Sequence, residues 1–463
     1  MKRIFVSAGL AVIGVSGLHA ADTYAPDVTA LDATKIWSVS GTLRGFYDDN
    51  YTTAHNDADG KRASWGFEFS PSLSFLVPLQ QTEIGLRYTY GLYYYQDREN
   101  LGQNPIDQSH TADLWIDHAF TERVEGKIED TFAVSQEPQL TSQATSEPFR
   151  VEGNNINNVG VVSLHTELTM LFSTDLGYQN TYIQYQNHGA TQADVTPTTP
   201  PGVFFTPSGQ PGTGKGNSLA GILDQDDHLI WLNLNYMYAP DLTLFVGYQF
   251  GLNDYIGNEP IGFSIPAYSA GVGNPYYYSS SLNSDSHYIY VGGQYAFNES
   301  LSATLKVGAE ITDNDNLPSF DHQSTWNVTP YADAAATYTY LPGSYVQVGL
   351  TQSENSSDIA DPDPNTGDLT LYEESTVVYG SINQQITPYL LGSVIGRWQY
   401  STWHGGQYNN GAQSLYNIGL NLSYSISEHF SAELGYNFDY LAASSGVASY
   451  TRNQEYIGFT ASY

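Results

Sequence analysis

Two stretches near the C-terminus decide the fold: residues 416–426 read YNIGLNLSYSI, and residues 430–440 read FSAELGYNFDY. In both, every second residue is apolar or aromatic, and the residues between them are polar, charged or glycine. An alternation of this kind places the apolar side chains on one face of an extended strand and the polar ones on the other. Only residues 427–429 separate the stretches, so we predict two antiparallel strands joined by a tight turn.

The same alternation recurs along most of the chain, for example over residues 242–252 and 301–311. Short turns such as Asn298-Glu299 and Ser173-Thr174 alternate with long polar loops such as 254–284. One end of the predicted sheet therefore has short turns, whereas the other end has long loops. We expect about eighteen strands, over residues 37–48, 64–77, 82–95, 111–121, 123–135, 157–173, 175–187, 227–239, 241–253, 285–298, 300–312, 324–340, 344–354, 371–386, 388–401, 413–427, 430–441 and 450–463.

This pattern predicts an all-β fold, a transmembrane antiparallel up-and-down β-barrel. Bacterial outer-membrane barrels combine an even number of strands with short periplasmic turns and long external loops. The strands are long enough for a tilted crossing of about 9–11 residues, and aromatic residues at their ends resemble interfacial girdles. Alternation alone does not show which face is buried. A soluble all-β protein, such as an exported adhesin or a carbohydrate-binding sandwich, therefore stays an alternative.

The N-terminus has the features of a secretory signal peptide. Lys2 and Arg3 precede an apolar run of 15 residues, Ile4–Leu18, and the small residues Ala20 and Ala21 follow after His19. The run is shorter than the about 20 residues that a membrane-spanning helix needs. We expect cleavage after Ala20, a short periplasmic lead at 21–36, and one barrel domain over 37–463.

Composition excludes several classes of protein. A mean hydropathy of −0.33 and 41% hydrophobic residues argue against a bundle of apolar helices. A net charge of −33 makes nucleic acid an unsuitable partner. The chain has no cysteine, so neither disulfides nor thiolate-bound zinc hold the fold together.

The last and the first predicted strands each resemble those of a known family. The last strand has Ile457, Phe459, Ala461 and Tyr463 at alternate positions and ends in an aromatic residue. It resembles the C-terminal signature of Gram-negative outer-membrane β-barrels, which implies recognition by the barrel-assembly machinery and a location in the cell outer membrane. The first strand, SGTLRGFYDDN at 40–50, is similar to the opening of the putative β-barrel porin type 2 family.

The polar row of each strand would line the lumen if the apolar row faces lipid. The charged side chains expected on this pore-lining face are Glu68, Glu83, Arg87, Arg123, Glu125, Lys127, Glu129, Lys306, Glu310, Asp333, Arg397, Glu433 and Asp439. They would set the electric field that sorts solutes by charge. The alternative is that neighbouring strands satisfy one another through cross-strand pairs.

The long loops are strongly acidic, so the outer mouth should attract cations; a solvated surface is the alternative. One loop carries the oxygen-bearing residues Asp361, Asp363, Asn365 and Asp368 close together. Such groups suit Ca²⁺, but the spacing departs from the EF-hand loop and a plain polar loop is favoured. We therefore expect no metal and no cofactor.

Two loops are long enough to narrow the passage. The 188–225 loop contains Val203-Phe204-Phe205, and the 254–284 loop contains Ile261, Phe263, Ile265 and Tyr276-Tyr277-Tyr278. Such apolar clusters need to pack, either against the inner wall or in a cap of loops over the mouth, or against another subunit.

No Gly-x-Ser-x-Gly or His-Glu-x-x-His motif is present, and Ser163 and His165 share only a strand face. We therefore predict a non-enzymatic porin-like channel for passive diffusion of small hydrophilic solutes. Its expected partners are outer-membrane lipid, the barrel-assembly machinery and those solutes, with the oligomeric state left open. The alternatives are a substrate-specific or polysaccharide-exporting barrel, or a structural or adhesive surface barrel.

Overall fold

The computed structural model describes residues 36–54, 61–135, 154–186, 189, 192–195, 219–314, 316–357, 359–443 and 449–463. The expected signal peptide, most of the lead and the Val203-Phe204-Phe205 cluster lie outside these residues. No helix within the described ranges is long and apolar enough to cross a membrane.

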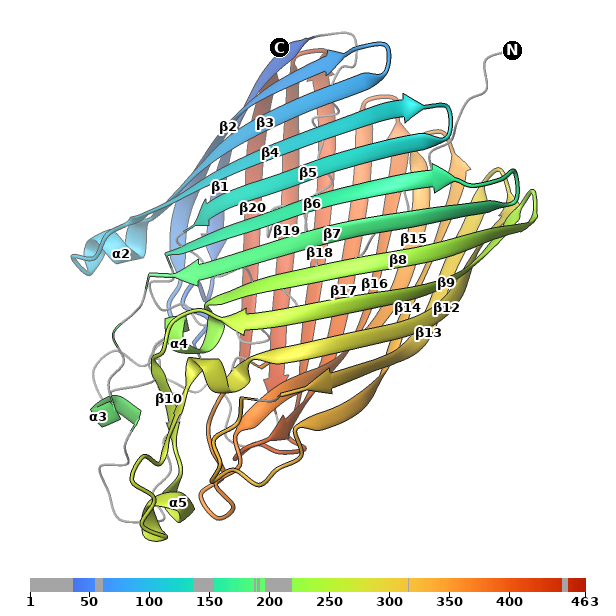
Figure 1. Ribbon diagram of the computed structural model, residues 1–463. Coiled ribbons are helices and arrows are strands. Elements are labelled where there is room, and N and C mark those ends of the chain that lie inside the picture. The colour runs from blue at the N-terminus through green and yellow to red at the C-terminus, as the bar shows by residue number, and fades with distance from the viewer. Residues whose placement is uncertain are drawn as a thin grey trace.

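Eighteen strands form one closed antiparallel sheet (Figure 1). Each strand pairs with its neighbour along the chain, and β1 pairs with β20 to close the barrel. The predicted eighteen-stranded up-and-down barrel is thus confirmed. The strands are β1 Trp37–Asp48, β2 Ser64–Pro78, β3 Thr82–Tyr95, β4 Ile106–Thr121, β5 Val124–Ser135, β6 Asn155–Glu167, β7 Phe172–Tyr185, β8 Gln225–Ala239, β9 Leu242–Tyr255, β12 Ser284–Asn298, β13 Leu301–Asp313, β14 Trp326–Leu341, β15 Ser344–Ser356, β16 Thr370–Thr387, β17 Leu390–Gly405, β18 Ala412–Ser427, β19 Phe430–Ala443 and β20 Tyr450–Ser462.

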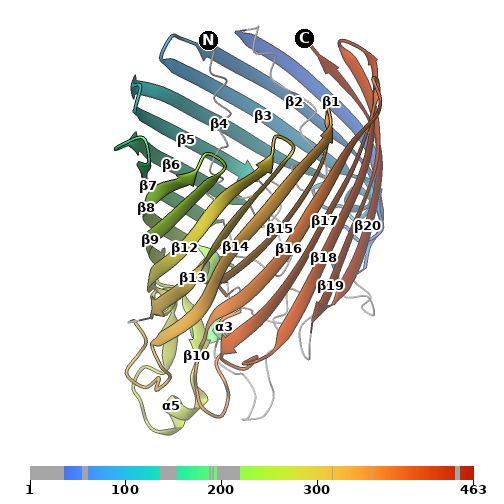
Figure 2. The same cartoon turned by 90° about the vertical axis from the view of Figure 1, so that its right-hand side faces the viewer.

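The long loops gather at one end of the barrel, and the C-terminal end of β20 lies at the other (Figures 1 and 2). The loops carry short elements that the sequence pattern did not predict. These are a small two-stranded sheet, β10 Pro260–Phe263 with β11 Tyr276–Tyr278, the helices α2 Gln96–Asn100, α3 Gln192–Val195, α4 Leu219–Leu223 and α5 Ile265–Ser269, and the 3₁₀ turn η1 Ser279–Leu282.

The apolar row of each strand faces outward. In β18, Ile418, Leu420 and Leu422 are between 41% and 43% exposed, whereas Asn417 and Asn421 are 2% and 7% exposed. A soluble sandwich would bury the first set and wet the second, because burial of apolar area drives its folding. This inverted pattern contradicts the alternative of a soluble all-β protein.

Exposed aromatic side chains lie at both ends of the strands. At the turn end, Trp37 contacts Tyr463 in a tilted arrangement, with ring centroids 5.6 Å apart. At the long-loop end, Trp65 at the start of β2 and Trp326 at the start of β14 are 65% and 57% exposed. Amphipathic rings of this kind suit the boundary between hydrocarbon and water.

One predicted turn is wrong. The sequence pattern placed a strand over 157–173 and a turn at Ser173-Thr174, but β6 ends at Glu167 and β7 begins at Phe172. The Thr169 hydroxyl oxygen accepts hydrogen bonds from the amides of Leu171 and Phe172, which bends the chain there. The apolar residues Leu168, Met170 and Leu171 imitate a continuing strand although Met170 is 89% exposed.

Candidate pore and its inner wall

The closing seam of the barrel is held by ion pairs on the inward face. Arg44 of β1 contacts Glu68 of β2 at 3.1 Å and Glu433 of β19 at 2.6 Å. Its guanidinium also lies over the Tyr456 ring, 5.2 Å from the centroid. Glu68 and Glu433 were expected on this face, whereas Arg44 was missed. Its position was readable, because it alternates with the outward residues Leu43 and Gly45.

A second buried pair joins the first and last strands toward the long loops. Arg452 of β20 donates to Asp48 Oδ2 of β1 at 2.6 Å, and its other terminal nitrogen lies 4.0 Å from Asp439 of β19. Asp48 is 0% exposed and Arg452 is 7% exposed. A charge pair this dry is stable only because each partner neutralises the other.

The residues that follow Asp48 extend this contact. Asp49 accepts from the backbone amide and the side-chain amide of Asn453 at 2.7 and 2.8 Å. The Asn50 side chain donates to the Thr451 carbonyl at 3.0 Å. The Tyr-Asp-Asp-Asn segment that carries the family resemblance therefore binds β20 through an ion pair and hydrogen bonds.

The facing wall holds its lysine among aromatic rings. Lys306 of β13 donates to the Tyr331 hydroxyl at 2.9 Å and lies about 5 Å from the Tyr290 and Tyr331 ring centroids. Asp333 of β14 is the register partner of Lys306. Cation–π contacts therefore replace a short ion pair at this expected pore-lining base.

The remaining expected residues are distributed around the wall. Lys127 of β5 contacts Asp117 at 3.3 Å and Glu125 at 3.8 Å, and Arg397 of β17 donates to Gln399 at 2.8 Å. The contact between Lys127 and Asp117 joins neighbouring strands, as the cross-strand alternative expected, whereas the other two lie within one strand. Glu83 and Arg87 lie on β3, which pairs with β4, and Glu129 lies on the same strand face as Lys127. Arg123 lies in the turn before β5 and not in the strand, because β5 begins at Val124.

The β15–β16 connection leans into the mouth of the barrel. β14 pairs with β15 only from Ala332 onward, so residues 326–331 lack a partner in β15. The Glu354 amide donates to Glu310 Oε2 at 3.1 Å, and the Asn253 side chain on the distant strand β9 donates to Ser356 at 2.6 Å. Residues 353–356 nevertheless stay paired with β16. The ends of β15 and β16 therefore move inward together.

The loop that follows, residues 357–369, packs between its neighbours. Ile359 is buried with Trp403 and Tyr408 near β17, and the Tyr277 hydroxyl of β11 donates to the Gly367 carbonyl at 2.7 Å. Burial and the adjacent Asp321 carboxylate raise the pKa of Tyr277, so it stays a donor. This loop was expected as part of an acidic rim and was weighed as a calcium site, but its packing was not predicted.

The expected apolar residues of the 254–284 loop join a cluster made by several loops. Ile261 and Tyr277 are fully buried there with Leu223 from the β7–β8 connection and Leu369 from the β15–β16 connection. The described part of this loop therefore packs against other loops, which agrees with the alternative of a cap at the mouth.

The oxygen-bearing loop residues are used locally. Asp363 Oδ1 accepts from the amides of Asn365 and Thr366 at 2.7 and 2.9 Å, which forms a tight turn. Asp361 Oδ2 is buried without a hydrogen-bond partner, and burial raises the pKa of Asp361 to about 6. Within the described ranges, no group of three or more His, Cys, Asp or Glu side chains is arranged around a metal position.

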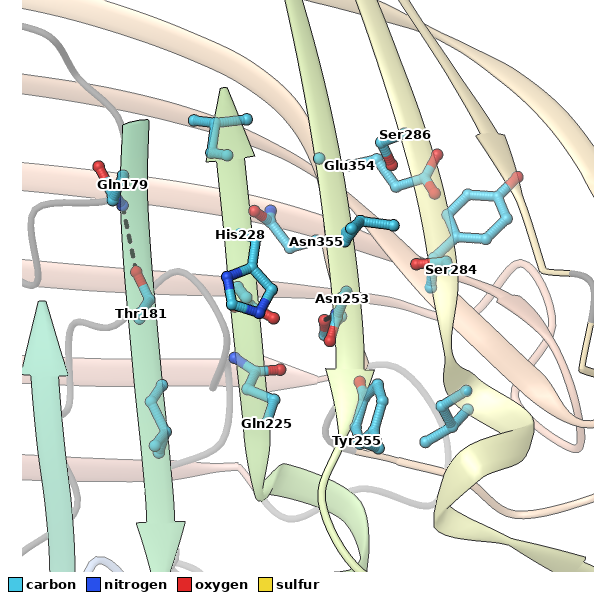
Figure 3. A pocket seen from close by; sticks show the side chains of 18 of the residues that line it. Gln179, Thr181, Gln225, His228, Asn253, Tyr255, Ser284, Ser286, Glu354 and Asn355 are labelled. Carbon is cyan, nitrogen blue, oxygen red and sulfur yellow. Dashed lines mark hydrogen bonds between the residues drawn. The ribbon is translucent and has the colours of Figure 1, made fainter. Parts of the chain in front are cut away.

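A cavity of about 180 Å³ lies on the inner side of strands β6–β9, β12 and β13, and the inward end of β15 helps to line it (Figure 3). Its polar lining includes Asn157, Gln179, Asp227, Asn253, Glu310 and Glu354. Of these, only Glu310 was expected to line the pore. The others lie on inward rows whose alternation could be read, but the sequence does not show that β15 bends toward them.

No family model and no curated protein matches the chain, so the resemblance to the type 2 porin family stays a prediction. Solved structures with a similar fold include OccK1 (OpdK) of Pseudomonas aeruginosa, at 10% identity and a TM-score of 0.43, which covers 92% of this chain and 99% of that one. OccK3 (OpdO) of the same organism has 11% identity and a TM-score of 0.41 over 92% and 95% of the chains. OccAB4 of Acinetobacter baumannii has 10% identity and a TM-score of 0.41 over 93% and 99%.

Proposed function

We propose that the protein is an outer-membrane channel through which small hydrophilic solutes diffuse passively. One observation carries the proposal: a closed eighteen-stranded barrel exposes its apolar rows outward and holds charged residues of both signs on its inward face. Lipid favours the first surface, and water favours the second. Barrels of 16–18 strands are wide enough for an aqueous passage.

Conductance in planar bilayers tests this function. The purified full-length barrel should give stepwise ion currents, and unheated and boiled samples should migrate differently in a gel. A folded, membrane-inserted barrel that carries no current would instead support the structural or adhesive alternative. Recovery of the chain in the soluble periplasmic fraction would contradict membrane insertion.

The exposed row at the end of β20 supports assembly by the barrel-assembly machinery. Ile457 and Phe459 are both 57% exposed, and Tyr463 is 62% exposed. Deletion of Tyr463, or Phe459→Asp, should lower the amount of barrel at the cell surface, with Glu428→Gln in the adjacent turn as a control. Wild-type surface levels for both variants would remove this signature from the argument.

The enzyme alternative has little support in the described geometry. His165 Nδ1 lies 2.6 Å from Asp175 Oδ1, its register partner on β7. Among the described residues, no hydrogen bond connects His165 to Ser163. A histidine–carboxylate pair on a barrel wall is readily explained as a cross-strand contact.

The cavity favours substrate-specific diffusion as a second candidate function. A channel that only sieves by size has no need of a cavity that is lined by carboxyl and amide side chains behind an inward-leaning strand end. Competition between solutes would separate the two functions. In a general channel, neutral and charged solutes of the same size should reduce the ion current equally.

A further inference from the structure

The cavity of about 180 Å³ has an unusual lining. Among the described residues that line it are three carboxylates, Asp227 of β8, Glu310 of β13 and Glu354 of β15, and no Lys or Arg. Elsewhere on the wall, Arg44, Lys127 and Arg452 each contact carboxylates directly. Three carboxyl groups are therefore gathered in one cavity whose described lining holds neither Lys nor Arg.

Some residues that line this cavity carry hydrogen-bond acceptors that have no donor. Asp227 Oδ1, Asn157 Oδ1 and Asn253 Oδ1 are buried and have no hydrogen-bond partner. The Asn253 side-chain nitrogen is already committed to Ser356 at 2.6 Å. Buried polar atoms in native proteins are nearly always satisfied, by the protein or by ordered water. The residues that line this cavity therefore have more acceptors than the wall satisfies, and a ligand that brings N–H or O–H donors suits them.

The two glutamates are held in place by neighbouring strands. Glu310 is 2% exposed and accepts from the Glu354 amide at 3.1 Å. Glu354 Oε2 accepts from the side chains of Asn327 and Thr329 on β14 at 2.6 and 3.3 Å. Figure 3 shows Glu354 and Asn355 near Asn253 and Ser286, which come from β9 and β12. The site is thus built from five strands, β9 and β12 to β15, and does not depend on one flexible loop.

We propose that this cavity is a binding site for small solutes that carry protonated amines. An ammonium group brings three donors and a positive charge, which matches both the orphaned oxygens and the excess of carboxylates. An anionic solute would be repelled, and a neutral polyol would leave the charge uncompensated. As the substrate class of the proposed channel, this assignment rests on the proposed function, although binding itself does not.

Calorimetric titration of the full-length barrel, folded in detergent, tests the site with 1,4-diaminobutane as probe. The diamine should bind saturably, and Asp227→Asn and Glu354→Gln should each weaken its Kd at least tenfold. Glu299→Gln, in the turn between β12 and β13, removes the same charge from the same strand pair far from the cavity and should leave the Kd unchanged. Each variant is first checked for heat-modifiable migration, so that loss of folding is recognised.

Matched probes decide the chemistry of the ligand. 1,4-Butanediol has the same chain without the charge and should not compete. Equal binding of the diol, or an unchanged diamine Kd in both cavity variants, would overturn the proposal. Displacement of the diamine by calcium at lower concentration than by a second amine would reassign the cavity to a metal ion.

Bilayer currents separate this proposal from the channel function. The diamine should block the potassium current of the wild type and block the Glu354→Gln variant at least tenfold less well. Current without block or binding would refute the amine site alone. Saturable diamine binding by a barrel that never conducts would refute the channel and leave the site standing.

Discussion

At the residue scale, two ion pairs at the closing seam differ in burial. Arg452 and Asp48 are almost completely buried, whereas Lys61 and Asp49, 3.5 Å apart, are partly exposed. Loss of one partner from a buried pair leaves a desolvated charge, which typically costs about 3–5 kcal/mol. An exposed pair contributes about 0–1 kcal/mol.

The first prediction follows from this contrast. Asp48→Asn should lower the free energy of unfolding by about 3 kcal/mol, because Asp439 at 4.0 Å only partly compensates Arg452. Lys61→Gln should change it by less than about 1 kcal/mol. Urea unfolding of the barrel in lipid vesicles measures both values. Equal effects of the two variants would contradict a stabilising role of the Arg452–Asp48 pair between β1 and β20.

The second prediction concerns pH and Asp361. Its pKa is about 6 against an ordinary value of 3.8, so the folded loop binds a proton more readily than the unfolded loop. Stability at this site is therefore present at low pH and is lost as pH rises from about 4 through about 6. Asp361→Asn should slow amide exchange of residues 359–369 at pH 7.5 and change it little at pH 4.

Asp363→Asn serves as the control for that experiment. Asp363 accepts two backbone amides in its turn, and its replacement should not reproduce the gain in protection at high pH. Equal protection of the wild type and Asp361→Asn across this pH range would show that the carboxylate of Asp361 is not desolvated.

At the element scale, alternation was sufficient to locate strands but not to show how they bend. β1 and β3 begin and end as predicted, because apolar and polar residues alternate over most of each strand. β4 begins at Ile106, five residues before the predicted 111, because Asp107, Gln108 and Ser109 carry no apolar row. The inward lean of β15 depends on the Ser356–Asn253 contact between distant strands, and no local pattern encodes it.

The candidate site was predicted to a similar extent. Strand parity identified Glu68, Glu310, Asp333 and Glu433 for the inward face, because each follows an outward apolar residue by one position. Partner choice was not accessible, because the contact of Arg44 with Glu433 joins residues that are 389 positions apart. The cavity was missed for the same reason, since it forms only where β15 approaches β8 and β9.

The third prediction identifies the loop that narrows the mouth. Residues 360–367 lie beyond the inward-leaning end of β15 and contact both the β17 side and the β10–β11 hairpin. Replacing them by a short Gly-Ser linker should raise single-channel conductance and the size limit for sugars. Deletion of 196–216, the loop that the sequence suggested, is the matched comparison. A larger increase from that deletion would assign the constriction to the 188–225 loop.

At the scale of the whole molecule, charge is the dominant property. The chain carries 48 Asp and Glu against 15 Lys and Arg. On the described inward face the bases Arg44, Lys127 and Arg452 are engaged by carboxylates, so the surplus of negative charge is not neutralised from within. The field at the mouth and along the wall should therefore favour cations.

The last prediction is that this preference is real and depends on salt. Reversal potentials across a potassium chloride gradient should show cation selectivity that is strongest near 0.01 M, where the Debye length is about 30 Å, and weak at 1 M, where it is about 3 Å. Arg397→Gln should increase the selectivity, because it removes a wall base that is only 9% exposed and is therefore poorly screened. Joint replacement of Asp363 and Asp368 by Asn should reduce the selectivity at low salt and have little effect at 1 M, since rim charges act through water. Anion preference of the unmodified channel at low salt would contradict the argument at its base, because no redistribution of a few loop charges could reverse a field set by the whole chain.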